Sequence, residues 1–236
     1  MIELLSHFMS DRSPYYGTKS VDRASATEFS SSTVDRGPFR VRTMRWSFPN
    51  HLGTHIDFPS HFLEDGITLS DYKPADFWFT RIGCLELPPP PDGKSSRVLT
   101  ANDLEKSVWR GNCQDHEAEL VFFRTGIAEL RDNPATVERY IFEGPGFSAD
   151  LAAPLAKRFP GLRCIGLDSI SVSAYAFREE GRGAHVAFMK KGWLLIEDAK
   201  LDRLPSLIDR ATGLLIAPTL VEKADGSPVS LWLFYS

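Results

Sequence analysis

Cysteine is scarce in this sequence, and its placement argues against a disulfide framework. Only three cysteines occur among the 236 residues, Cys84, Cys113 and Cys164, and no C-x-x-C pair is present. An odd number of widely spaced cysteines is typical of reduced thiols in a cytoplasmic protein. Because Cys84 and Cys164 have apolar neighbours, we expect both thiols to be core residues rather than catalytic ones. The cysteine pattern therefore predicts a cytoplasmic location.

Long apolar runs and blocks of positive charge are also absent. No stretch approaches the roughly 18 apolar residues of a membrane-spanning helix, so no membrane association is expected. The first residues contain Glu3 and Asp11 rather than a basic region followed by an apolar segment, which predicts no signal peptide. The net charge is −4 and no cluster of Lys or Arg occurs, so a nucleic-acid partner is not expected. These absences predict that neither a membrane nor a nucleic acid is a partner.

No internal repeat or long low-complexity tract divides the chain. Hydrophobic residues make up 42% and charged residues 25%, which is ordinary for a globular protein. The clearest loop is Pro88–Pro91 followed by Asp92 and Gly93, because prolines supply no backbone donors and Asp-Gly favours a turn. Neither side of this loop resembles a complete core, so we interpret it as a surface insertion. Residues 1–236 are therefore expected to form a single domain.

Short apolar or alternating segments predict a strand-rich protein. One alternating strand and six short apolar runs bounded by turn residues are strand candidates: 39–48, 82–87, 120–123, 164–167, 193–196, 214–217 and 229–235. Thr100 to Asp103 has the pattern of a helix start, and Ser148 can cap a helix in which Leu151, Leu155 and Phe159 share a face. We therefore expect a mixed α/β or α+β fold around a mixed sheet.

Three histidines and one aspartate are concentrated between residues 51 and 61. His51, His55, Asp57 and His61 lie within 11 residues of a chain that has only six histidines. Imidazole and carboxylate groups are ligands for catalytic divalent metals such as zinc and manganese. A cluster of this size predicts a metal site rather than a loop of solvated histidines.

The spacing of this segment indicates an extended chain with two bends. His51 and His55 are four residues apart, as in zinc proteases, but Gly53 replaces the expected glutamate and Pro59 disfavours a helix. All the polar candidates are odd-numbered, so an extended chain points them to one side. Since a straight strand would hold His51 and His61 too far apart, we expect bends at Gly53 and Pro59.

The residues alone leave the assignment of roles open. Asp57 has two oxygens and could bridge two metals, while His61 is offset and could act as a general acid/base. Further ligands must come from elsewhere in the chain. His185 precedes an apolar run that ends at Glu197, and a carboxylate at the end of a buried strand needs a partner. A metal, a salt bridge or a helix N-terminus would satisfy Glu197. Of the other histidines, His116 lies in a polar segment and is expected to be solvated.

The combined motifs resemble a known family. The segment His51-x-Gly-Thr-His55-x-Asp57-x-Pro59-x-His61-Phe62 resembles the signature of the cyclase family of metal-dependent hydrolases, which includes bacterial kynurenine formamidases and isatin hydrolases. The resemblance covers most of the chain and continues through Leu5-Ser6-His7, Arg124-Thr125-Gly126, Gly166-Leu-Asp168-x-x-Ser171, His185 and Glu197.

This resemblance implies a fold, a site and an assembly. It implies a swivelling β/β/α domain with a central, barrel-like mixed sheet flanked by a few helices, assembled as a homodimer or larger homo-oligomer. His51, His55 and Asp57 would bind one metal ion, and Asp57 would bridge to a second ion bound by His185 and Glu197. His61 would be the catalytic acid/base. The cofactor would be zinc or manganese, with one or two ions per subunit.

The resemblance also implies an activity. We expect metal-dependent hydrolysis of an amide C–N bond in an aryl formamide or a cyclic amide. Aromatic residues are candidates to line a pocket for an aromatic substrate, although each is individually more typical of core packing: Trp46, Phe48, Phe62, Trp78 and Trp193. The alternatives are lactone hydrolysis or a cyclisation/dehydration at the same site, and a non-catalytic metal- or ligand-binding protein. Leu4, Ser173 and Asp198 depart from the family pattern and leave the substrate open.

Overall fold

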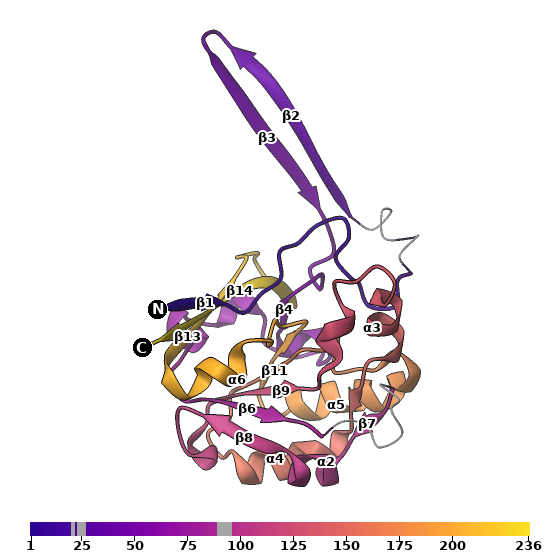
Figure 1. The fold of residues 1–236 in the computed structure, drawn as a ribbon, viewed down its shortest axis with the longest axis vertical. Coiled ribbons are helices and arrows are strands. Elements are labelled where there is room, and N and C mark those ends of the chain that lie inside the picture. Colours follow the sequence, from indigo (N-terminus) through magenta and orange to yellow (C-terminus); the bar gives the residue numbers. More distant parts are fainter. Residues whose placement is uncertain (20–21, 23–26, 89–95) are drawn as a thin grey trace.

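A ten-stranded mixed sheet organises the protein (Figure 1). The computed structural model describes residues 1–19, 22, 27–88 and 96–236. The strands of the sheet follow the order β5-β13-β14-β4-β12-β11-β9-β6-β8, and β1 pairs with β14. Their bounds are β1 Ile2–Leu4, β4 His55–Asp57, β5 Trp78–Phe79, β6 Ile82–Glu86, β8 Val108–Gly111, β9 Leu120–Arg124, β11 Cys164–Leu167, β12 Leu194–Glu197, β13 Ala211–Pro218 and β14 Gly226–Tyr235.

Four neighbouring strands of this sheet are parallel to one another. Strands β6, β9, β11 and β12 pair in parallel, whereas β4, β14, β13 and β5 extend the sheet through antiparallel pairs. The sheet curls so that its two edges approach each other. The Asn112 side chain, which follows β8 at one edge, donates hydrogen bonds to the carbonyl oxygens of Thr80 and Ala211 near the other edge. The mixed α/β fold with a curled, partly barrel-like sheet is thus confirmed.

In the described part of the chain, five α-helices and several short 3-10 turns connect the strands. The helices are α2 Ala101–Lys106, α3 Val137–Glu143, α4 Ala152–Arg158, α5 Arg178–Met189 and α6 Leu204–Leu207. The 3-10 turns are Pro59–His61, Leu69–Asp71, Pro74–Phe77, Asp115–Glu117, Ile127–Leu130, Ala149–Leu151, Tyr175–Phe177 and Ile208–Arg210. None of these described helices combines the length and the apolar character needed to span a bilayer.

The alternation of side chains along the parallel strands builds a core on each face of the sheet. Leu120 and Phe122 of β9 pack into one cluster with residues of β13 and β14. Val121 and Phe123 of the same strand pack into the other cluster, beneath α4 and α5. Strands covered on both faces are apolar at every position, which explains why they occur as short continuous apolar runs in the sequence. Cys84 and Cys164 lie fully buried in the first cluster, as predicted.

The predicted elements agree with the observed ones at their centres and differ by a few residues at their ends. All seven predicted strands are present, as β3, β6, β9, β11, β12, β13 and β14. Thr100 precedes α2, and Ser148 accepts a hydrogen bond from the Asp150 backbone N–H at the start of the turn leading into α4. Of the predicted proline-rich loop, only Pro88 is within the described residues, so the rest of that prediction lies outside them.

A long hairpin projects from the body (Figure 1). It consists of β2 (Glu28–Arg36) and β3 (Phe39–Ser47), which pair with each other and form a separate two-stranded sheet. Only the Phe29 side chain is partly buried, and several large apolar residues are exposed, including Trp46 at 62%. A second small sheet joins β7 (Val98–Leu99) to β10 (Gly146–Phe147). We call residues 28–47 the hairpin arm.

Candidate metal centre

The short strand β4 places two of the predicted ligands on one face of the sheet. It lies between β12 and β14, with His55 opposite Glu197 and Asp57 opposite Leu195. Ile56, between the two, points into the hydrophobic cluster on the other face. Because paired residues of antiparallel strands project to the same side, this register brings His55, Asp57 and Glu197 together. The prediction that alternate residues of the motif point to one side is therefore confirmed for His55 and Asp57.

Bends on both sides of β4 fold the rest of the motif back. Gly53 has a φ of +66°, a left-handed conformation that glycine adopts without steric cost. Pro59 begins a 3-10 turn that ends at His61. As a result, the rings of His51 and His61 stack with their centroids 4.0 Å apart. The two predicted bends are confirmed.

The buried part of the centre is a tight cluster of imidazoles and carboxylates. The Nε2 atom of His55 lies 3.3 Å from Glu197 Oε2 and 3.4 Å from Asp57 Oδ1. The Nε2 atom of His185 lies 3.2 Å from Glu197 Oε1 and 3.7 Å from Asp57 Oδ2. On the outer side, His51 Nδ1 is 2.8 Å from Asp57 Oδ1. The structure therefore brings all five predicted ligands, and also His61, into one place.

Backbone groups fix which ring nitrogens face the cluster. His55 donates from Nδ1 to the carbonyl oxygen of Gly53, and His185 donates from Nδ1 to that of Gly181. Each histidine thus presents Nε2 to the carboxylates, which is the arrangement of metal-binding histidines held by a second hydrogen bond. The Oε1 atom of Glu197 accepts hydrogen bonds from the Val172 backbone N–H and the Ser171 hydroxyl.

Helix α5 supplies His185, and the sequence did not predict this helix. Gly181 lies where α5 packs against Ser173, so closely that an added Cβ would be 2.3 Å from the Ser173 Cα. This close packing accounts for the glycine at position 181. The His185 ring stacks on Phe62, with ring centroids 4.4 Å apart. The imidazole of His185 is thus held by the Phe62 ring on its face and by the Gly181 carbonyl oxygen at Nδ1.

Burial and neighbouring charges shift the pKa values of this cluster in opposite directions. Burial lowers the pKa of His185, but its interactions with the carboxylates of Asp57 and Glu197 outweigh burial and raise the pKa to about 10. Burial raises the pKa of Asp57, but the neighbouring imidazoles of His185, His51 and His55 bring it well below its ordinary value. Burial and the Asp57 charge raise the pKa of Glu197, yet hydrogen bonds from His185 and His55 lower it to about 2. The lowered pKa values of Asp57 and Glu197 therefore favour their ionised forms.

One oxygen in the cluster lacks a partner, and this fits a metal ion. The Asp57 Oδ2 atom is buried and has no hydrogen-bond partner among the described residues. A buried, ionised oxygen is costly unless a hydrogen bond or a cation compensates it. The ion pairs of Asp57 and Glu197 within the described residues are all made with histidines. Imidazole nitrogens and carboxylate oxygens directed at one place form a donor set that suits zinc or manganese.

The geometry groups these donors differently from the sequence-based prediction. Within the described residues, two sets of three have donor atoms close enough to share an ion, namely His51, Asp57 and His61, and His55, Asp57 and Glu197. Asp57 belongs to both sets, which agrees with a bridging carboxylate. His61 lies beside His51, so its position suits either a ligand or a nearby acid/base. The assignment of each ligand to one ion stays a prediction.

Two residues near the centre were missing from the sequence-based site. Asp225, in the loop before β14, accepts a hydrogen bond from His61 Nδ1 at 3.0 Å. Gly226 follows it, and an added Cβ there would lie 2.2 Å from His51 Cε1, so only glycine leaves room for that imidazole. The Asp225-Gly226 pair resembles an ordinary turn, so no local signal marks it as part of a site.

A cavity of about 270 Å³ opens onto the centre. Its walls include His51, His61, His185 and Glu197, together with the rings of Tyr15, Tyr16 and Phe62 and the side chain of Arg182. Of the five predicted pocket aromatics, only Phe62 lines this cavity. Trp46 is exposed on the hairpin arm, Phe48 stacks on Phe29 at its base, Trp193 is buried in the core and Trp78 packs beside Phe234.

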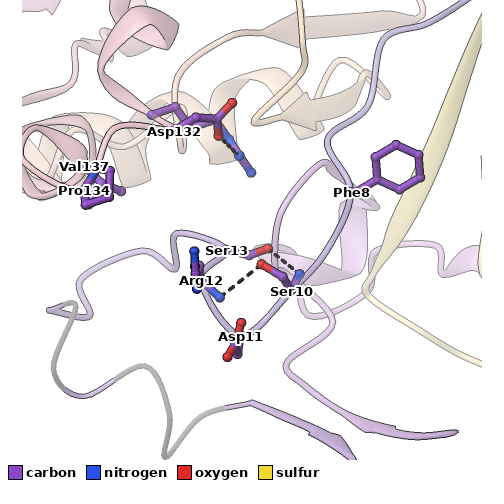
Figure 2. A pocket seen from close by; sticks show the side chains of 9 residues that line it. Phe8, Ser10, Asp11, Arg12, Ser13, Asp132, Pro134 and Val137 are labelled. Atoms are coloured by element: carbon purple, nitrogen blue, oxygen red, sulfur yellow. Dashed lines mark hydrogen bonds and ion pairs between the residues drawn. The ribbon is translucent and has the colours of Figure 1, made fainter.

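A larger cavity, of about 480 Å³, lies elsewhere between the N-terminal segment and residues 131–137 (Figure 2). Its lining includes Phe8, Asp11, Arg12 and Asp132, and none of the predicted ligands. Volume alone does not identify a catalytic site, because function depends on the chemistry of the lining residues. We therefore assign the candidate site to the smaller, histidine-lined cavity.

A buried ion pair supports the strand end that carries Glu197. Asp198 adopts a left-handed conformation with a φ of 53°, which Asp and Asn tolerate better than other side chains. Its carboxylate accepts two hydrogen bonds from the Arg131 guanidinium, at 2.5 and 2.6 Å. Its carbonyl oxygen accepts a hydrogen bond from the Thr54 hydroxyl, which ties β12 to the residue before β4. The departure from the family pattern at Asp198 thus has a structural role.

Replacing Arg131 with alanine is expected to lower the free energy of unfolding by about 3–5 kcal/mol, because the buried Asp198 carboxylate loses its cationic partner. Urea denaturation of the two proteins measures this change. Arg139→Ala is the matched control, since Arg139 pairs with Glu143 at the surface and such pairs contribute about 0.5 kcal/mol or less. Equal effects of the two substitutions would contradict a structural role for the buried pair.

Comparisons with known proteins identify the family and the fold of this chain. The model of the Cyclase family matches residues 4–174. The kynurenine formamidase of Bacillus mycoides (strain KBAB4) is 27% identical over 206 residues, which cover 86% of this chain and 83% of that protein. Isatin hydrolase A from Labrenzia aggregata, solved with benzyl benzoate, superimposes with a TM-score of 0.71 at 18% identity and covers 100% of this chain and 94% of its own. A structure described as a predicted metal-dependent hydrolase from Bacillus stearothermophilus superimposes with a TM-score of 0.70 at 21% identity. The match covers 99% of this chain and 97% of that one.

Proposed function

The chain belongs to the Cyclase family, and from this premise we propose that it is a metal-dependent hydrolase that cleaves an amide C–N bond. The observation that carries the proposal is the buried cluster of His55, Asp57, His185 and Glu197, in which the Asp57 Oδ2 atom has no hydrogen-bond partner among the described residues. A purely structural metal site is usually closed, whereas this one borders a cavity large enough for a small substrate. The open side favours catalysis over structural binding.

The residues around the cavity have complementary roles in this reaction. His51, His55, Asp57, His185 and Glu197 would hold one or two divalent ions. Bound there, a divalent ion lowers the pKa of water from 15.7 toward about 7 and polarises the substrate carbonyl. His61, which is partly exposed at the cavity, would take a proton from the attacking water and deliver it to the leaving nitrogen. Proton delivery is needed because an amine anion is a poor leaving group.

An aromatic amide is the substrate class that the cavity supports. Tyr15, Tyr16 and Phe62 offer ring surfaces beside the histidines. Such rings favour flat, apolar groups through stacked or edge-to-face contacts. The names of similar proteins, kynurenine formamidase and isatin hydrolase, point in the same direction. We propose an aryl formamide or a cyclic aryl amide as the substrate, with zinc or manganese as the ion.

Hydrolysis assays on two probe amides test this proposal. Formanilide would yield formate and aniline, and isatin would open at its ring amide, each with consumption of one water. We expect hydrolysis of at least one of them, its loss after metal chelation and its return when zinc or manganese is added back. Hydrolysis of aryl lactones alone would favour the lactonase alternative, and tight metal binding without turnover of any probe would favour a non-catalytic binding protein.

We also propose that the hairpin arm docks on a second copy of this chain. A two-stranded hairpin is only marginally stable in isolation, and exposed apolar patches are typical of interaction surfaces. Met44 and Trp46 lie on one face of the arm next to Phe29, and both are more than half exposed. The arm carries four arginines and two acidic residues, whereas the whole chain has a net charge of −4, so a second copy offers complementary charge.

Light scattering of the purified protein tests this contact. We expect the wild type to have twice the 26.4 kDa mass of one chain, and the double variant with Met44→Ser and Trp46→Ser to shift toward the monomer. Thr43→Ala, on the opposite face of the same strand, is the control and should leave the mass unchanged. A monomeric wild type, or a double variant that remains dimeric, would overturn the proposal.

A further inference from the structure

Asp225 lies close to the candidate acid/base, in a loop far from the motif in sequence. The backbone carbonyl oxygen of Asp225 accepts a hydrogen bond from the Phe58 N–H at 2.9 Å, which ties this loop to the end of β4. Its Oδ1 atom accepts a hydrogen bond from the Asn50 side-chain amide at 2.7 Å. Because hydrogen bonds hold both the backbone and the Oδ1 atom of Asp225, the direction of its other carboxylate oxygen, Oδ2, is fixed.

That second oxygen faces the imidazole of His61. His61 donates from Nδ1 to Asp225 Oδ2 at 3.0 Å. Because a carboxylate only accepts hydrogen bonds, this contact places the ring proton on Nδ1 and leaves Nε2 as the basic atom. The neighbouring imidazole of His51 stacks on the same ring, and the Phe62 ring meets it edge-on at a centroid distance of 4.8 Å. The ring of His61 is therefore held in both orientation and tautomer.

We propose that Asp225 is the positioning residue of His61, which fixes the Nδ1–H tautomer and directs Nε2 at the reacting water and leaving nitrogen. This inference rests on the proposed hydrolase function and adds the residue that prepares its acid/base. The arrangement is a carboxylate–histidine pair, the same logic by which a buried aspartate orients the histidine of a serine protease. The Asp225 side chain is 44% exposed, so we assign it orientation of the ring rather than strong charge stabilisation.

A second interpretation must be separated from this one. Asp225 Oδ2 also lies 3.4 Å from His51 Nε2, so the carboxylate could act by orienting a metal ligand instead. In that case its removal would weaken metal binding. In the proposed role, its removal would lower turnover while the metal content and the KM stay close to the wild-type values.

The decisive experiment is a double-mutant cycle between Asp225→Asn and His61→Ala on the metal-loaded protein. Removal of an orienting partner is expected to lower kcat about 10–100-fold on formanilide or isatin, with KM and bound metal unchanged. In the His61→Ala background the same substitution should have no further effect, because residues that act through one another are non-additive. Glu222→Gln, an exposed acid three residues earlier in the same loop, is the matched control and should not alter kcat.

A spectroscopic measurement provides a test that does not depend on turnover. In ¹⁵N NMR spectra of the metal-free protein, the His61 ring should show the Nδ1–H tautomer, and Asp225→Ala should convert it to a mixture with Nε2–H. An unchanged tautomer would overturn the positioning role, and so would equal effects of Asp225→Asn with and without His61. Absence of hydrolysis by the wild type would overturn the proposed function instead, and the NMR result would still decide the contact.

Discussion

Replacing Asp57 with asparagine is expected to remove both metal binding and hydrolysis. Asp57 is the one residue common to both groups of donors, and its buried Oδ2 atom has no hydrogen-bond partner in the described residues. An amide has nearly the same shape as a carboxylate but supplies no negative charge, so the cavity should persist while affinity for a dication falls. Because metal activation changes the pKa of water by several units, we expect kcat/KM to fall at least about 1,000-fold.

Metal analysis after equilibrium dialysis, together with the amide assay, checks this result. Asp65→Asn is a suitable control, since that aspartate lies in the same part of the chain but is exposed. Thermal unfolding adds a separate reading, because a ligand that binds only the native state stabilises it by about 4 kcal/mol at 1,000 times its Kd. Added metal should therefore raise the Tm of the wild type but not that of Asp57→Asn. Full metal content in the variant would contradict the shared role of Asp57.

Replacing His61 with alanine is expected to preserve metal binding and abolish most turnover. A positioned general acid/base contributes about 10²–10⁴-fold to rate, so kcat should fall by that factor while the metal content stays at the wild-type level. The structure makes this experiment informative, because His61 is close enough to His51 and Asp57 to belong to a ligand set. Parallel measurements of bound metal and kcat distinguish the two roles.

The control for this substitution is His116→Ala. The His116 side chain is 68% exposed, as its polar surroundings predicted, and its removal should change neither quantity. If His61→Ala loses metal together with activity, His61 is a ligand and the proton transfer must be assigned to another group. If both quantities are unchanged, His61 has no part in the reaction.

The central motif could be predicted from sequence because it is local. His55 and Asp57 share one face of β4 simply because side chains alternate along a strand, and Gly53 and Pro59 signal their bends through their own backbone preferences. Cys84 and Cys164 are similarly local, since their apolar neighbours indicate the core. The residues alone offered His185 and Glu197 as candidates, and the family resemblance assigned them as ligands, since no spacing rule connects them to the motif.

The features that the sequence did not reveal depend on tertiary contacts. Helix α5 contains Gly181 and Gly183, which weaken its helical signal, and it is stabilised by packing against Ser173 and Phe62. Asp225 reaches His61 only because β14 pairs with β4, a contact between residues about 170 positions apart. The hairpin arm was half predicted: β3 alternates in sequence, whereas the serine-rich β2 lacks an apolar pattern of its own.

The most direct test of the metal-centred chemistry is a titration of one metal-free preparation with zinc or manganese, with bound metal and amide hydrolysis measured on the same samples. We expect no hydrolysis without metal, a rise in activity that follows occupancy, and saturation at one or two ions per chain. Hydrolysis by the metal-free protein, or full occupancy without activity on formanilide or isatin, would contradict the proposal that this cluster is a catalytic metal centre for amide cleavage.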